Sequence, residues 1–284
     1  MVKLKNDEIK PPKVYLGAKL EQRDTNGIQR WTIGSYDYID AAITTVKTSL
    51  KSKFKDYELP KNATSPMTSG FIPELDDSRE LDSDEITFFQ EMIGMLRWAI
   101  ELGQVDILHE VSILLQYQAM PRQGHLEQIF HIFRFLENKK KLTLHMDPDL
   151  PNIDYSLFTT NVEDFHPMYR DAKDKLPHGM PKARGRGLSL TAWVDASHGA
   201  NKVTRRSHTG FVIFLNRAPV MWYSKRQNTV ESSAFSSEFI AMKVCIETIQ
   251  GLRYKLRMFG IPIANDEPGY IFATMNWWLR TVQS

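Results

Sequence analysis

Residues 188–258 constrain the fold more than any other stretch, because three strand-like segments there precede one long helical segment. The first strand contains Asp195 among β-prone residues, the second covers 211–215, and the third covers 220–223. The helix carries Glu238 in its first turns. Its apolar residues recur close to the helical period, at Phe239, Met242, Ile246, Ile249, Leu252 and Leu256. Three antiparallel strands followed by a helix can bring together two carboxylates that are far apart in sequence.

The same stretch contains four short strings in a fixed order. They are Asp195-Ala196, then RRSHTG at 205–210, WYSKRQ at 222–227 and SEFIA at 237–241. Together they resemble the ribonuclease H domain of copia-type retrotransposon Pol polyproteins. The resemblance implies the α/β class, with a ribonuclease H-like mixed sheet and helices. It also implies two-metal hydrolysis of RNA in an RNA–DNA hybrid, in which Asp195 and Glu238 are catalytic residues and metal ligands.

The cofactor that this resemblance implies is Mg²⁺ or Mn²⁺. Mg²⁺ takes hard oxygen ligands, so carboxylates rather than His or Cys are expected in the site. The family pattern then requires a third carboxylate after the next strand, and that position falls on Thr274, whose side chain is neutral. The chain ends at Ser284, so the later helices and the last carboxylate of the family pattern have no sequence to form them. We therefore expect a truncated domain with weak or absent nuclease activity.

The expected partner is an RNA–DNA hybrid or another nucleic acid. The chain has a formal net charge of only +2, so binding must come from local basic surfaces. Near the strand ends, the candidate phosphate contacts are Arg205, Arg206, Lys225 and Arg226. Farther upstream, the surface candidates are Arg97, Arg122, His125 and the lysines at 139–141. For these upstream residues a solvated basic face is an equally good interpretation.

Residues 1–146 resemble other parts of the same polyproteins. Strand patterns at 14–20 and 31–33 flank an Asn-Gly turn, and a helical pattern follows at 36–53, as at the end of the reverse transcriptase palm. Helical patterns at 86–118 and after Pro121 resemble the thumb and connection. Ser83 or Asp84 is expected to cap the first of these helices, and Ser232 or Ser233 the later one.

These assignments divide the chain into four segments. We expect a β-hairpin palm remnant at 1–56, a mainly helical thumb and connection at 57–146, a linker at 147–187 and the truncated ribonuclease H-like domain at 188–284. No Tyr-x-Asp-Asp string occurs, so polymerase activity is not expected. Two other interpretations stay open: a non-catalytic nucleic-acid-binding or interaction module that keeps the fold, and a decaying retrotransposon reading frame.

Composition places the chain among ordinary globular proteins, with 42% hydrophobic and 25% charged residues. Its single cysteine, Cys245, excludes an internal disulfide and is expected to be a buried, inert thiol. The charged N-terminus lacks the apolar segment of a signal peptide, and no apolar run is long enough to span a bilayer. We expect a soluble intracellular protein, cytoplasmic or nuclear, without membrane contact. The sequence leaves the oligomeric state open.

Overall fold

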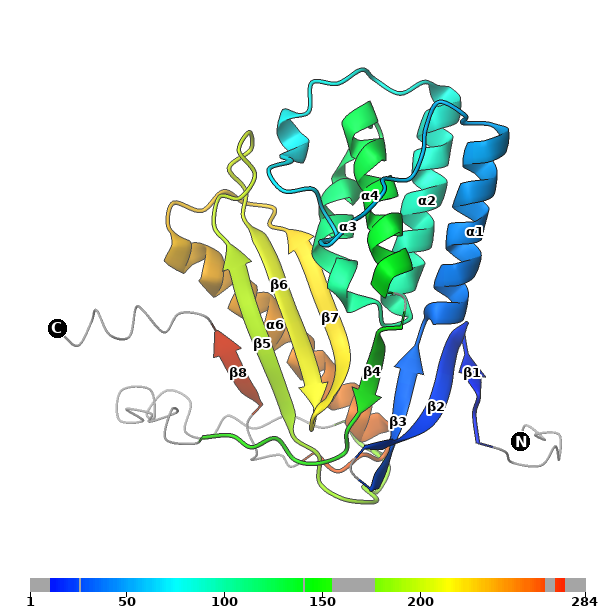
Figure 1. Cartoon of the computed structure of the whole chain (residues 1–284). Coiled ribbons are helices and arrows are strands. Elements are labelled where there is room, and N and C mark those ends of the chain that lie inside the picture. The colour runs from blue at the N-terminus through cyan, green and yellow to red at the C-terminus, as the bar shows by residue number, and fades with distance from the viewer. Residues whose placement is uncertain (1–10, 26, 140, 155–176, 264–268, 274–284) are drawn as a thin grey trace. The chain divides into compact units, whose positions relative to one another are not determined.

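The structure, a computed structural model, describes residues 11–25, 27–139, 141–154, 177–263 and 269–273 (Figure 1). The chain forms two compact units, the first within residues 1–146 and the second within residues 147–284. Among the described residues, the first unit combines a four-stranded sheet with several helices, and the second combines a four-stranded sheet with one helix. The chain is therefore a mixed α/β protein, in agreement with the α/β class that the sequence predicts. No helix among the described residues is both long and apolar enough to cross a membrane.

The first unit contains an antiparallel sheet in the order β1-β2-β3-β4. Its strands are β1 (Val14–Tyr15), β2 (Ala18–Thr25), β3 (Ile28–Gly34) and β4 (Thr143–Met146). β2 and β3 pair up to Thr25 and Ile28, which confirms the predicted hairpin. The predicted strand at 14–20 is wrong in one respect, since a turn divides it. Leu16 and Gly17 both have positive φ values, of 52° and 98°, so the chain reverses direction there.

Among the described residues of the first unit, four α-helices lie between β3 and β4 in the sequence (Figure 1). They are α1 (Tyr36–Ser52), α2 (Ser83–Glu101), α3 (Leu108–Leu114) and α4 (Gln123–Lys139). Short 3₁₀ segments lie between them, at Pro73–Leu75, Val105–Ile107 and Leu115–Tyr117. α1, α2 and α4 contact one another pairwise. Their apolar faces form a core with the fully buried residues Ile39, Phe89, Met92, Ile93, Leu96, Ile129, Phe130 and Phe133.

Helix α2 begins at Ser83, earlier than the sequence predicts, because its cap is Asp82 rather than Ser83 or Asp84. The Asp82 carboxylate accepts hydrogen bonds from the backbone N–H groups of Asp84 and Glu85. Glu85 in turn accepts a hydrogen bond from the Asp82 backbone N–H. This reciprocal arrangement is a capping box, which satisfies amide groups that the first helical turn leaves free.

The second unit contains a mixed sheet in the order β7-β6-β5-β8. Its strands are β5 (Leu190–Ser197), β6 (His208–Leu215), β7 (Ala218–Arg226) and β8 (Tyr270–Ala273). β5, β6 and β7 are antiparallel neighbours, whereas β8 runs parallel to β5. The three predicted strands are confirmed, and the third is longer than expected. Pro219 lies inside β7, which is tolerated because β7 is an edge strand with a register irregularity opposite it.

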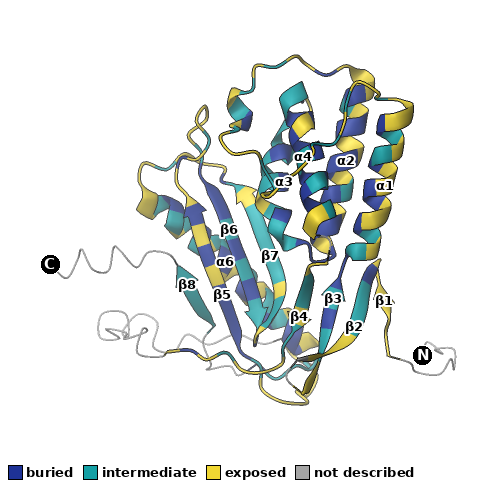
Figure 2. Ribbon diagram, in the orientation of Figure 1, coloured by how far each residue is buried: buried dark blue, intermediate teal, exposed yellow. Residues whose placement is uncertain are grey.

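Helix α6 (Ala234–Met258) packs against β5 and β6 and buries one face of this sheet (Figure 2). Ala192, Val194 and Ala196 face the helix, while Trp193, Asp195 and Ser197 alternate with them and are exposed. From the helix, Ala241, Cys245 and Ile249 enter the same core. Burial raises the pKa of the Cys245 thiol to about 11, which agrees with the inert role expected for it.

Candidate carboxylate site

Asp195 lies near the C-terminal end of β5, among the exposed residues of that strand. Its cross-strand partner on β6 is Gly210, and the last residue pair between β5 and β8 is Val194 with Ala273. A Cβ atom at residue 210 would have no neighbour closer than the Tyr223 carbonyl oxygen, at 3.9 Å. The space beside Asp195 is therefore open over the neighbouring strand.

Glu238 lies near the N-terminus of α6 and meets Asp195 there. The pKa of the Glu238 carboxyl is raised, first by burial and then by the negative charge of Asp195. A hydrogen bond between the two carboxyl groups also raises it, while a hydrogen bond from the Ala196 backbone opposes the shift. The helix that follows the three strands thus brings the two predicted carboxylates together.

Only part of the Glu238 carboxylate has a hydrogen-bond partner. Its Oε2 atom is buried and has no hydrogen-bond partner among the described residues. Buried carboxylate oxygens in folded proteins are almost always hydrogen-bonded, ion-paired or bound to a metal. An orphaned oxygen next to a second carboxylate is the arrangement that a bound cation would stabilise.

Around the first turns of α6, a buried polar network links the helix to the loop between β5 and β6. The hydroxyl of Ser237 lies 2.7 Å from His198 Nδ1 and 2.8 Å from the Ser207 hydroxyl. Ser207 also accepts a hydrogen bond from the backbone N–H of Gly199, at 3.0 Å. Ser207 and Ser237 are both fully buried. Because Ser237 directly precedes Glu238, this network fixes the helix position from which Glu238 reaches Asp195.

Gln227 extends the network from the end of β7. Its Nε2 donates to the Ser237 carbonyl oxygen at 2.9 Å and to the Thr209 hydroxyl at 3.0 Å. Its backbone N–H donates to the Ser207 carbonyl oxygen at 2.8 Å. The start of α6 is therefore hydrogen-bonded both to the β5–β6 loop and to the end of β7.

Ser207, Gln227 and Ser237 lie inside the sequence motifs, but the motifs alone assign them no role. One signal was available for Ser237. It lies four and eight residues before Ala241 and Cys245, so it occupies the stripe of α6 that packs on the sheet. A polar residue within a buried stripe needs a partner, which indicates a hydrogen-bond network at that point.

The four basic residues near the strand ends that are predicted to contact phosphates lie on different surfaces of the second unit. Arg205 has a φ of 56° and lies exposed in the β5–β6 loop, next to the half-buried Arg206. Arg226 pairs with His208, which pairs with Ser197, so Arg226 shares the sheet face of Asp195. Lys225, one residue earlier, points to the opposite face. Arg226 is thus on the face of Asp195 and Lys225 is not.

Arg122 belongs to the first unit and makes internal contacts there. Its guanidinium donates to the Ser78 carbonyl oxygen and forms an ion pair with Glu80 at 3.1 Å. A phosphate contact would have to compete with these bonds. His125 cannot be a surface residue as the sequence suggested, because only 2% of it is exposed. Its Nε2 lies 2.8 Å from the Pro73 carbonyl oxygen, and its Nδ1 accepts from the Arg122 backbone N–H.

Within the described ranges, no group of three or more His, Cys, Asp or Glu side chains could hold a metal ion. Asp195 and Glu238 are therefore a pair without a third acidic partner in that part of the chain. Thr274, the position that the family pattern assigns to the third carboxylate, lies outside the described residues.

The sequence is similar to proteins encoded by mobile elements. The chain is 27% identical, over 212 residues, to a putative transposon Ty5-1 protein of Saccharomyces cerevisiae. It is 24% and 22% identical, over 201 and 179 residues, to retrovirus-related Pol polyproteins from the transposons RE1 and RE2 of Arabidopsis thaliana. These matches cover 75%, 71% and 63% of the chain. It is thus a retrotransposon-related α/β protein.

The same relatives indicate the kind of retrotransposon protein to which the chain is similar. The chain is homologous to the Pol polyproteins of Ty5/copia-type retrotransposons. It spans about half the length of the Ty5-1 relative, 53%, and only 11% and 10% of the two Arabidopsis polyproteins. No family model matches the sequence, and no solved structure matches it either.

Proposed function

We propose that the second unit is ribonuclease H-like and that its reaction is metal-dependent hydrolysis of the RNA strand in an RNA–DNA hybrid. The observation that carries this proposal is the convergence of Asp195 and Glu238, with the pKa of Glu238 raised by burial and by the Asp195 charge. Perturbed carboxyl pairs of this kind are typical of sites that bind cations or transfer protons. The relation to retrotransposon Pol polyproteins supports the same reaction class.

The chemistry of the two carboxylates fits a hard divalent cation. Glu238 Oε2 is buried without a partner, and Asp195 is exposed beside it, so both residues can offer oxygen ligands. A bound Mg²⁺ or Mn²⁺ would polarise the phosphoryl oxygen of the scissile bond and neutralise charge that develops there. Asp195 and Glu238 would hold that ion, and the hydrogen bonds of Ser237 keep Glu238 in position.

Substrate binding in this proposal depends on basic residues of the same sheet and of the loop that follows β5. Arg226 lies on the sheet face of Asp195, and Arg205 and Arg206 lie in the loop that follows β5. An A-like hybrid would be bound through its phosphates and 2′-hydroxyl groups rather than through its bases. Arg226 is therefore the basic residue that we assign most directly to the substrate.

The expected rate is low, because the described residues supply two carboxylates where the family pattern has more. The test is cleavage of a labelled RNA–DNA hybrid by the full chain in Mg²⁺ and in Mn²⁺. Cleavage that Asp195→Asn abolishes, and that the exposed α6 variant Glu247→Gln keeps, would support the enzyme. Cleavage that survives Asp195→Asn would contradict it.

The shortage of carboxylates favours a second candidate function, a non-catalytic unit that binds the hybrid. In that case the full chain binds the hybrid without cleaving it in either metal. Arg226→Gln then weakens binding, and Asp195→Asn leaves it unchanged or strengthens it by removing a negative charge. Absence of both binding and cleavage would contradict both functions.

A further inference from the structure

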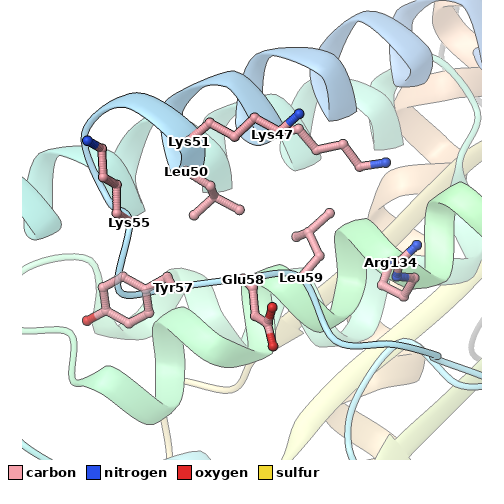
Figure 3. A pocket seen from close by; sticks show the side chains of 8 residues that line it. All are labelled: Lys47, Leu50, Lys51, Lys55, Tyr57, Glu58, Leu59 and Arg134. Carbon is pink, nitrogen blue, oxygen red and sulfur yellow. The ribbon is translucent and has the colours of Figure 1, made fainter.

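A pocket of about 590 Å³ in the first unit belongs to no site described above (Figure 3). One side of the pocket is the C-terminal half of α1 and the turn after it, which carry Lys47, Lys51 and Lys55. The other side includes Tyr57 and Leu59, and Arg134 of α4 lies at one end. Pockets of about 300–1,000 Å³ are the usual size for small-molecule ligands.

Positive charge dominates this pocket. Its lining contains four cations and one carboxylate, Glu58. A second carboxylate, Glu137, forms ion pairs with Lys47 and Arg134. Lys51 and Lys55 are exposed and form no hydrogen bond or ion pair with the rest of the described chain. Two ammonium groups are therefore available to an anionic ligand.

The spacing of the lysines strengthens this inference. Lys47, Lys51 and Lys55 follow one another at intervals of four residues, which places Lys47 and Lys51 on one face of α1. Like charges at this spacing destabilise a helix by a few tenths of a kcal/mol, although a lysine in the last turn benefits from the helix dipole. A solvated basic stripe would explain the lysines, but it would not explain the pocket that Tyr57, Leu59 and Arg134 complete on the other side.

The wall opposite the lysines is held in place before any ligand binds. The Tyr57 hydroxyl donates to Glu85 at 2.7 Å and accepts from Arg79 at 2.6 Å, so its ring has a fixed orientation. Arg134 Nε donates to the Pro60 carbonyl oxygen, which fastens the segment after Tyr57 to α4. Preorganised walls reduce the entropy that a ligand must lose on binding.

We propose that this pocket binds a phosphorylated small molecule of nucleotide size. Its phosphates contact Lys51 and Lys55, and its planar group lies against Tyr57 and Leu59. Lysine is a common phosphate ligand, and aromatic side chains stack on planar bases. A long nucleic-acid strand fits less well, because the two lysines that form no ion pair lie on one wall and Glu58 is exposed on the segment opposite them.

The test measures binding of ATP to the full chain by calorimetry, without any substrate of the second unit. We expect saturable binding of one ATP per chain, weakened at least tenfold by the double substitution Lys51→Gln with Lys55→Gln. The matched control removes the same charge from exposed lysines outside the pocket, Lys13→Gln with Lys53→Gln, and should change the affinity less than twofold. No saturable binding, or equal weakening in the control, would overturn the proposal.

Two further probes identify the part of the ligand that is bound. Inorganic tripolyphosphate should bind more weakly than ATP, because it lacks the planar group; equal affinity would overturn the contact with Tyr57. A single-stranded oligodeoxynucleotide that binds more tightly than ATP, with the same sensitivity to the double substitution, would overturn the small-molecule assignment. Because the assay does not involve Asp195 or Glu238, its failure would say nothing against the ribonuclease H-like proposal.

Discussion

Two glutamates near helix N-termini differ in the groups that surround their carboxylates and in the direction in which their pKa values are shifted. In the first unit, Glu85 of α2 has a side chain that is only 7% exposed, and it forms two hydrogen bonds with Arg79. Tyr57 and the Asp82 backbone N–H donate further hydrogen bonds. These bonds, led by Arg79, lower the pKa of Glu85 to about 2.

In the second unit, Glu238 of α6 has another carboxylate as its neighbour. Burial and the Asp195 charge raise the pKa of Glu238, and its Oε2 has no hydrogen bond within the described ranges. Glu85 is thus a structural group whose charge the fold stabilises, whereas the charge of Glu238 is unfavourable in the metal-free chain. Unfavourable charges kept beside one another are more typical of a functional site than of a structural one.

The largest expected effect in this comparison comes from Glu85→Gln. The substitution removes the charge that Arg79 and Tyr57 bind, and we expect it to cost about 2–3 kcal/mol of unfolding free energy in the first unit. Hydrogen exchange of the α2 and α4 amides measures this locally. Glu91→Gln, an exposed position on the same helix, is the control and should change stability by less than about 0.5 kcal/mol.

A smaller loss of unfolding free energy is expected from Ser237→Ala in the second unit. The substitution leaves His198 and Ser207 without a shared hydroxyl partner, which should cost about 1–2 kcal/mol. Exchange rates of the α6 amides report the change, with the exposed Ser232→Ala as control. Unchanged exchange in Ser237→Ala would show that the network does not hold the helix.

Glu238→Gln should change stability in the opposite direction to Glu85→Gln. It removes the repulsion with Asp195, so the metal-free second unit should gain stability on the order of 1 kcal/mol, the scale of a partly screened charge pair. Glu247→Gln on the same helix removes only an exposed pair with Lys243 and should have almost no effect. A loss of stability in Glu238→Gln would show that Glu238 is stabilised in a way that resembles Glu85.

The two glutamates should also give opposite responses to acid. The folded pKa of Glu85 is depressed, so its contribution is present above 4.5 and is lost as the pH falls toward about 2. The folded pKa of Glu238 is raised, so its contribution is present below 4.5 and is lost as the pH rises through the folded value. Exchange measured separately in α2 and α6 across this range should show the two trends, and Glu85→Gln should remove the first.

Several parts of the fold could be predicted from sequence because they depend on local patterns. Strand alternation around Asp195 and the helical period after Ser233 depend on neighbours a few residues away, and both agree with β5 and α6. The meeting of Asp195 with Glu238 also follows from the order of the elements. Ser233 caps α6 as expected, accepting a hydrogen bond from the Ser236 N–H.

Other features depend on partners distant in sequence and could not be found this way. His125 is buried because Pro73 and Arg122 provide both of its hydrogen bonds, which no local pattern indicates. Lys225 and Arg226 lie on opposite faces because of the sheet register. The hydrogen bonds of Ser237 join it to residues thirty or more positions earlier, so predicting them requires the positions of the strands relative to the helix.

The central claim is that Asp195 and Glu238 form a cation site, and titration with Mn²⁺ followed by electron paramagnetic resonance tests it most directly. Because the readout is binding, it does not require any nuclease activity to survive. We predict saturable Mn²⁺ binding by the full chain that Asp195→Asn and Glu238→Gln each abolish and that Glu247→Gln retains. Binding that is equally strong in all four proteins, or absent from all of them, would contradict the account.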